Sequence, residues 1–130
     1  MSEQDDKTLP EGEMITRTLA MPADTNPDGD IFGGLVLSQM DIAGGIMTKK
    51  IAKGRTVTIA LDSMVFHLPV NVGDVLCCYC KLLKIGNSSI EIKMEAWALR
   101  QYKETREKVT EAIFTYVNVD ENSKPKKIEK

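Results

Sequence analysis

The feature that most constrains this chain is a helical segment, residues 34–51 (GLVLSQMDIAGGIMTKKI), that is apolar around most of its circumference. Its apolar residues form one stripe at helical spacing and a second group on another side of the helix. The stripe comprises Val36, Met40, Ala43, Met47 and Ile51, and the second group comprises Leu35, Ile42 and Ile46. A helix of this kind is expected to be buried on most sides, so the remaining chain must surround it.

The other ordered segments show the pattern of strands. Apolar and polar residues alternate over residues 15–21 and 88–99, whereas residues 75–85 are nearly all apolar, as in a central strand covered on both faces. Residues 56–66 change phase, which predicts a bulge near Asp62 and Ser63, and residues 109–119 form a last strand. Five strands with short turns and one long helix indicate the α+β class, an antiparallel sheet curled around the helix.

The chain has 130 residues, the size of one domain. We place that domain at residues 14–120, between a flexible N-terminal segment, 1–13, and a flexible C-terminal tail, 121–130, which has almost nothing to bury. A five-stranded sheet around one helix leaves strand edges and an apolar rim uncovered. We therefore expect at least a dimer.

Composition excludes several classes of protein. The net charge of −2 lacks the positive field that binding to nucleic acid requires. No apolar run is long enough to cross a bilayer, and the first residues do not resemble a secretory signal. Cys77, Cys78 and Cys80 are too crowded for a disulfide framework. We expect a cytoplasmic protein with no nucleic-acid or membrane partner.

Asp41 is the residue that the helical pattern does not explain. On a helical projection it lies beside Ser38, Gly44 and Gly45, and no basic residue stands one turn away. A carboxylate on a buried helix without a local partner is costly, so such groups cluster at functional sites. Two interpretations stay open from the pattern: an acid at a dimer interface, or a catalytic group facing free volume beside small residues.

Gly33 and Gly34 stand at the start of the helix. Unpaired N–H groups and the positive end of the helix dipole favour an oxyanion there. Together with Asp41, they offer an acid or base and a carbonyl-polarising site, as acyl transfer requires. A tight turn would use the same two glycines.

The loop before the helix contains Asn26, Asp28 and Asp30, which suit turn formation and helix capping. The amide of Asn26 has a second interpretation, the orientation of water or a carbonyl group. Calcium is not expected because no glutamate stands at the twelfth position of an EF-hand loop. A two-histidine zinc site is excluded because His67 is the only histidine, and the cysteines suit core filling. We expect no metal and no cofactor.

Several residues could meet phosphate groups: Lys84, Arg55, Ser88 and Ser89, together with the lysines that end the helix. An ordinary solvated surface and a hairpin turn at Gly86–Asn87 would contain the same residue types, so the pattern alone leaves both interpretations open.

Five motifs together carry a resemblance to a known family. They are Leu19-Ala20-Met21-Pro22, Asp24-Thr25-Asn26, Gly29-Asp30-Ile31-Phe32-Gly33-Gly34, Ser38-Gln39-Met40-Asp41 and Val72-Gly73-Asp74-Val75. The chain resembles the bacterial hot-dog acyl-CoA thioesterases of the YciA-like kind over about residues 16–120. The resemblance implies five antiparallel strands wrapped around a helix, paired into double hot-dog dimers, with trimers of such dimers and active sites between subunits.

The resemblance also implies hydrolysis of acyl-CoA to a free acid and CoA. Asp41 then acts as the general base or nucleophile, assisted by Asn26, and the amides of Gly33 and Gly34 polarise the thioester carbonyl. Lys84, Ser88 and Ser89 match a segment near CoA, which is part of the substrate rather than a cofactor. His67 stands where many relatives carry a basic residue, and Asp30 either assists or caps the helix.

Two other functions compete with hydrolysis. A hot-dog hydratase or dehydratase would need a histidine in the site, and His67 at a strand end is poorly placed for it. A non-catalytic acyl-CoA sensor would keep the ligand site while Asp41 served packing.

Overall fold

A computed structural model describes residues 9–129 of the chain. The elements in chain order are β1 (Glu13–Leu19), the 3-10 turn η1 (Pro22–Asp24), α2 (Gly33–Ala52), β2 (Thr56–Phe66), β3 (Val75–Ile85), β4 (Ser89–Leu99) and β5 (Arg106–Asn118). The helix and four of the strands lie within about two residues of their predicted bounds. β5 begins three residues before the predicted position, at Arg106, because the preceding connection is a tighter hairpin than its polar sequence suggests.

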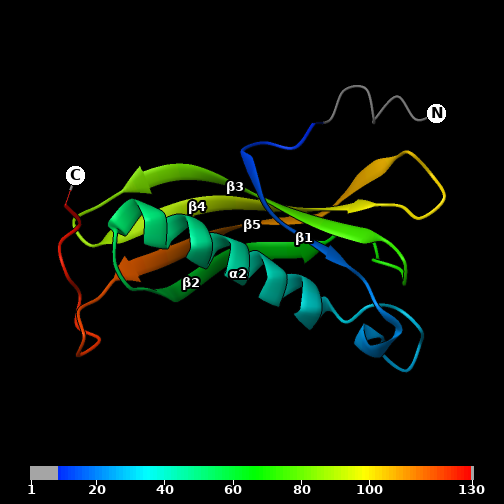
Figure 1. Ribbon diagram of the computed structural model, residues 1–130, viewed down its shortest axis with the longest axis horizontal. Coiled ribbons are helices and arrows are strands. Elements are labelled where there is room, and N and C mark those ends of the chain that lie inside the picture. Colours follow the sequence, from blue (N-terminus) through cyan, green and yellow to red (C-terminus); the bar gives the residue numbers. More distant parts are fainter. Residues whose placement is uncertain (1–8, 130) are drawn as a thin grey trace.

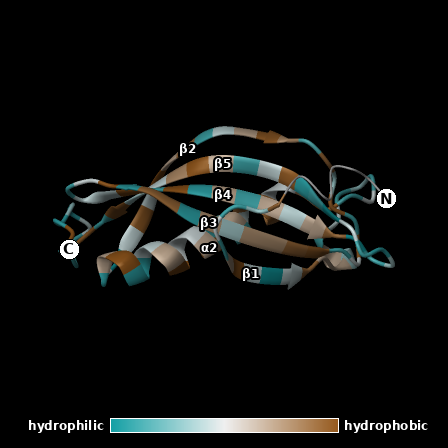
Figure 2. Ribbon diagram, turned by 90° about the horizontal axis from the view of Figure 1, so that it is seen from above, coloured by the Kyte–Doolittle hydropathy of each residue, from teal (hydrophilic) through white to brown (hydrophobic). Residues whose placement is uncertain are grey.

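The five strands form one sheet in the order β1-β3-β4-β5-β2, and every neighbouring pair is antiparallel. Helix α2 lies along one face of this curved sheet (Figures 1 and 2). The core fills the space between them. Alternate residues of β4 from Ile90 to Ala98 are fully buried there, as are Met40 and Ala43 of the helix. This confirms the prediction of an α+β fold with a sheet wrapped around the helix.

The predicted bulge in β2 is confirmed. The register with β5 shifts between Asp62 and Val65, and Ser63 adopts a positive φ of 53°. The one extra residue lets the phase of the apolar pattern change within one strand.

Two predictions about burial are wrong for a single protomer. Strand β3 is buried on both faces only in its first half, since Leu82 and Leu83 in its second half are exposed. Helix α2 is open on one side, where Ile42 is 50% and Ile46 40% exposed. The edge strand β2 next to this side exposes four large apolar residues, Ile59, Leu61, Val65 and Phe66. An uncovered apolar surface of this kind marks an interface.

The C-terminal tail differs from its prediction. Ile128 is 2% exposed, and its amide N–H donates to the carbonyl of Asn87 at 2.8 Å. The side chain of Asn118 also donates to the carbonyl of Lys126 at 3.1 Å. This one apolar side chain, in a tail that otherwise has almost nothing to bury, fixes the tail beside the β3–β4 turn. Of the expected flexible N-terminal segment, residues 1–8 lie outside the described part.

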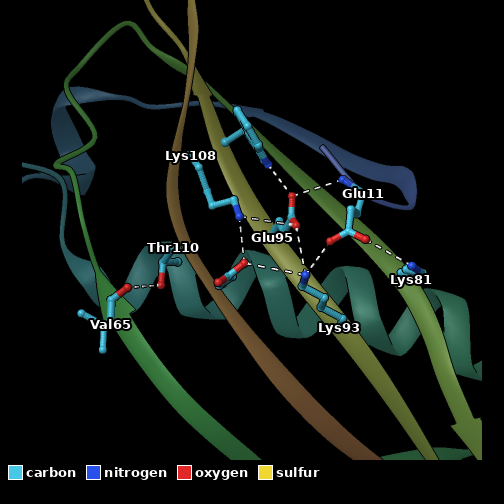
Figure 3. A network of polar contacts seen from close by, with 9 residues as sticks. Glu11, Val65, Lys81, Lys93, Glu95, Lys108 and Thr110 are labelled. Carbon is cyan, nitrogen blue, oxygen red and sulfur yellow. Dashed lines mark hydrogen bonds and ion pairs between the residues drawn. The ribbon is translucent and has the colours of Figure 1, made fainter. Parts of the chain in front are cut away.

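The outer face of the sheet carries a network of charged residues (Figure 3). Its centre is Glu95, which is 1% exposed although it alternates with core residues on β4. The indole of Trp97 donates to its Oε1 at 2.8 Å, and the ammonium groups of Lys93 and Lys108 lie 3.7 and 3.6 Å from its Oε2. The amide N–H of Glu11 also donates to Oε1, at 3.2 Å. The N-terminal segment therefore covers this part of the sheet.

Candidate active site

Asp41 lies in the middle of α2, and two hydroxyl groups from the sheet hold its carboxylate. Thr58 of β2 donates to Asp41 Oδ1 at 2.5 Å, and Tyr116 of β5 donates to the same oxygen at 2.8 Å. The Tyr116 hydroxyl also lies 3.0 Å from the main-chain carbonyl oxygen of Asp41. Thr58 and Tyr116 are opposite one another in the β2–β5 ladder, so the register of these strands brings both hydroxyls to one point.

The partners of this carboxylate are neutral. Among residues 9–129, no lysine, arginine or histidine forms an ion pair with Asp41, and no donor contacts its Oδ2. Burial, followed by the hydrogen bond to Asp41, raises the pKa of Tyr116 well above its ordinary value. The phenol is therefore protonated at neutral pH and acts as a donor.

Asp41 also lines a cavity of about 510 Å³ between α2 and the edge strand β2. The other lining residues are Ile42, Gly45, Ile46, Lys49, Thr56, Val57, Thr58 and Tyr116. The carboxylate thus has both fixed partners and adjoining space. Lys49 places one cation on the wall of the same cavity.

Gly44 explains why the helix carries a costly glycine beside Asp41. A Cβ atom on Gly44 would lie 2.2 Å from the hydroxyl oxygen of Tyr116. The group that approaches the helix here is therefore the Tyr116 side chain. Gly45 is different, because the nearest atom to its added Cβ would be the Lys49 Nζ at 3.5 Å.

The start of α2 is open. Its N-cap is Phe32, whose side chain cannot cap, and neither Gly33 nor Gly34 donates a main-chain hydrogen bond within the described chain. Gly33 lines a separate hollow of about 380 Å³ with Phe66, His67 and their neighbours. Asp41 stands seven residues after Gly34, roughly 10 Å further along the axis at about 1.5 Å per residue. Within one chain, these amides and the Asp41 carboxylate are therefore too far apart to act on the same substrate atom.

Asn26 organises the loop before the helix. Its Oδ1 accepts hydrogen bonds from the amides of Asp28 and Asp30 at 2.9 and 3.1 Å, as the turn prediction requires. The prediction that this loop caps the helix is wrong, because the N-cap is Phe32 and no side chain caps it. Within the described residues the amide nitrogen of Asn26 has no partner, so it is available as a donor.

The residues considered for CoA phosphates lie at the other end of the helix. Arg55 follows its C-terminus and donates to Ser123 Oγ at 3.1 Å. Ser88 and Ser89 border the β3–β4 turn, which the tail contacts through Ile128. Lys84 is exposed on β3, near the same turn. All four thus lie at one end of the molecule.

The cysteines are core residues, as predicted. Cys78 and Cys80 face the helix, whereas Cys77 points to the other face. Burial raises the pKa of Cys78 to about 11 and that of Cys80 to about 12, so both thiols are protonated at neutral pH. His67 is exposed at the end of β2, against the hollow that Gly33 lines. This arrangement does not support a cysteine nucleophile.

Sequence reasoning missed Thr58 and Tyr116. Both lie in strands whose alternation suggested packing, and hydroxyl groups are common in strands. The available signal was Gly44, because an unexplained glycine in a buried helix indicates that something lies close to it.

Comparison with known proteins connects this site to a family. The model of the thioesterase superfamily matches residues 28–105. An acyl-CoA thioester hydrolase, YciA, from Salmonella typhimurium is 53% identical over 120 residues, which cover 90% of each chain. The chain belongs to the YciA-like acyl-CoA thioester hydrolases of the thioesterase superfamily.

Solved structures of such hydrolases share the fold. The hexameric thioesterase y2039 from Yersinia pestis has a TM-score of 0.90 and 54% identity, covering 94% of this chain and 99% of its own. The hexameric broad-specificity acyl-coenzyme A thioesterase HI0827 has a TM-score of 0.90 and 50% identity, covering 95% and 85%. These YciA-like relatives confirm the hot-dog fold and the recognition of the family from its motifs.

Proposed function

We propose that this chain hydrolyses acyl-CoA to a free carboxylic acid and CoA, with Asp41 Oδ2 as the general base. Oδ2 takes a proton from water while the water oxygen bonds to the thioester carbon. The carbon–sulfur bond then breaks, and the CoA sulfur leaves and is protonated. The observation that carries this proposal is a carboxylate that lines a cavity, with Oδ1 held by two hydroxyls and no donor on Oδ2 in the described part of the chain.

Release of free thiol from acyl-CoA substrates tests the proposal, with Asp41→Ala and Asp41→Asn as the variants. We expect kcat to fall by about 10²–10⁴-fold, the usual contribution of general-base catalysis. Glu91→Gln, a change on the outer face of β4, is the matched control. Retained turnover in both Asp41 variants would overturn the mechanism. Binding of acyl-CoA without turnover by the unmodified chain would favour a sensor.

A relative supports the choice of residues. Acyl-CoA hydrolase from Staphylococcus aureus has a TM-score of 0.78 and 26% identity, and it has been studied as an aspartate-to-alanine and as a threonine-to-alanine mutant. Those two positions are separated by 17 residues, the separation of Asp41 and Thr58.

We infer that each active site combines two subunits. The amides of Gly33 and Gly34 lie too far from Asp41 within one chain, and the apolar residues beside the Asp41 cavity are uncovered. A second copy packed on β2 and the open side of α2 would cover them and bring its own helix start and Asn26 to the carboxylate. The open N–H groups would then polarise the carbonyl.

Mixing two inactive variants tests this shared site. Chains with Asp41→Asn are unfolded and refolded with chains carrying Asn26→Ala. If each site takes Asp41 from one chain and Asn26 from the other, random dimers regain about one quarter of the active sites. Sites contained within one chain would regain none. Each variant refolded alone is the control.

The hexameric state of the relatives supports assembly of this chain as a trimer of dimers. Light scattering of the full chain should give six times the protomer mass. A dimer or tetramer would contradict this part of the proposal.

Arg55, Lys84, Ser88 and Ser89 are proposed contacts for the anionic part of CoA because they gather at one end of the fold. Replacement of Arg55 by Met should raise KM while kcat changes little, since a phosphate contact remote from the reacting carbon contributes uniform binding. An unchanged KM would remove Arg55 from the set.

We propose that hydrolysis needs no metal or cofactor and takes place in the cytoplasm. Three free cysteines packed in β3 suit a reducing compartment. Among the described residues, no helix is both long enough and apolar enough to cross a membrane. Thiol release that survives exhaustive dialysis against a chelator, and recovery of the protein in the cytoplasmic fraction, are the expected results.

A further inference from the structure

We propose that Tyr116 and Gly44 form a positioning pair that fixes the Asp41 carboxylate and leaves Oδ2 as its reactive oxygen. This inference rests on the proposed role of Asp41 as the base. Tyr116 touches neither substrate nor water in this mechanism and acts through Asp41 alone.

The hydroxyl of Tyr116 is shared between two oxygens of one residue. It lies 2.8 Å from Asp41 Oδ1 and 3.0 Å from the main-chain oxygen of Asp41, so it fixes the side chain relative to its own helix turn. Thr58 adds a second donor on Oδ1. Two donors on one oxygen and none on the other orient the carboxylate plane, and a base held in one orientation pays less entropy in the reaction.

Gly44 is the complement of that hydroxyl. It lies three residues after Asp41, on the same side of α2, and any Cβ there would overlap the phenol, with distances of 2.2 Å to the oxygen and 2.7 Å to Cζ. Tyr116 is itself buried and packed beside Phe114, so it has little freedom to move away. The glycine is therefore required by the phenol rather than by the helix.

The pair also favours the charged form of the base. Hydrogen bonds donated to a carboxylate stabilise its ionised form, which keeps Asp41 able to accept a proton. The other groups that face this site are Lys49 on the cavity wall and Cys80 beside Tyr116. Burial raises the pKa of the Cys80 thiol to about 12, so this thiol is neutral throughout the acid range. Among the groups at this site, Asp41 is the one that accepts hydrogen bonds from both Tyr116 and Thr58.

The first experiment measures kcat, KM and the pH profile of thiol release for Tyr116→Phe. We expect kcat to fall about tenfold with little change in KM, and the acid limb of kcat/KM to move up by about one pH unit, as for loss of one hydrogen bond to a charged group. Tyr79→Phe, on the outer face of β3, is the matched control and should retain the wild-type profile. A purely structural role for Tyr116 would lower the melting temperature without moving the pH limb.

The second experiment tests whether Gly44 and Tyr116 act through one contact. Gly44→Ala should reduce kcat as Tyr116→Phe does, since the methyl group displaces the phenol. Adding Tyr116→Phe to Gly44→Ala should then change kcat by less than about twofold, because the contact is already lost. Independent, multiplying effects would overturn the pairing.

The donor set is tested without changing the core at Tyr116. Thr58→Val should move the acid limb upward as Tyr116→Phe does, and Thr58→Ser should restore it, because serine keeps the hydroxyl. These Thr58 variants decide the inference if Tyr116→Phe folds poorly. The variant Asp41→Asn separates the two proposals. Activity retained by Asp41→Asn would overturn the proposed function. If Asp41→Asn is inactive but the acid limb of the pH profile is unshifted in Tyr116→Phe and Thr58→Val, only this inference is overturned.

Discussion

Two carboxylates of this chain, Asp41 and Glu95, lie on opposite sides of the sheet and differ in the partners that hold them. Glu95 is buried between two ammonium groups, an indole N–H and a main-chain N–H, and both of its oxygens have partners. Asp41 accepts hydrogen bonds from two neutral hydroxyls on Oδ1, has no donor on Oδ2 among residues 9–129, and lines a cavity. The partners of Glu95 compensate its charge fully, whereas those of Asp41 leave part of its charge available to a substrate.

This difference separates a structural acid from a reactive one more clearly than burial does. A carboxylate between ammonium groups gains most from remaining ionised and is a poor proton acceptor. A carboxylate oriented by hydroxyls stays ionised without a neutralising cation, and its free oxygen can meet a substrate proton. The exposed fraction alone would have selected Glu95, the more buried of the two.

The largest expected effect is on catalysis, measured as kcat for Asp41→Asn beside Glu95→Gln. Asp41→Asn should lose about 10²–10⁴-fold because it removes the base. Glu95→Gln keeps the size of the side chain on the far face of the sheet, so kcat per folded molecule should change by less than about twofold. A comparable loss of kcat in both variants would show that the partners of a carboxylate do not distinguish the catalytic acid from the structural one.

The second effect is on the free energy of unfolding, which should fall when Glu95 is replaced but not when Asp41 is replaced. Glu95→Ala leaves the buried indole N–H of Trp97 without an acceptor, and such a loss costs about 1–3 kcal/mol. Asp41→Ala should leave stability unchanged or increase it, because functional groups are often held at a cost in stability. Urea unfolding of both variants measures the difference. A large destabilisation by Asp41→Ala would assign that residue a structural role as well.

The sequence predicted most of the fold because its signals are local. The apolar period of α2, the phase change in β2 and the turn at Gly86–Asn87 are each visible within a short window. Asp41 could be found in the same way, as a charge where a helical pattern predicts burial. The resemblance of the loop and helix motifs then supplied the chemistry.

The partners of the two carboxylates could not be predicted, since they depend on register between distant segments. Tyr116 follows Asp41 by 75 residues, and Glu11 precedes Glu95 by 84. Alternation on β4 puts Glu95 on the polar face of the strand, but it gives no sign of the N-terminal segment that contacts Glu95 on that face. Ile128 was underestimated for the same reason, as one apolar residue in a polar tail has no periodicity to reveal it.

The smallest expected effect is a pH dependence of stability that arises from the charged network around Glu95. Hydrogen bonds from Lys93, and then from Lys81, lower the pKa of Glu11 from 4.5 to about 2. Because the folded pKa lies below the unfolded one, the unfolded chain binds more protons between these values, so this contribution is present above pH 4.5 and is lost as pH falls towards 2. We expect Glu11→Gln to lower the urea midpoint at pH 6 and to converge with the unmodified chain near pH 2. Glu13→Gln, outside this network, is the control. If the urea midpoints of Glu11→Gln and the unmodified chain differ by the same amount at every pH, Glu11 does not fix the N-terminal segment over Glu95.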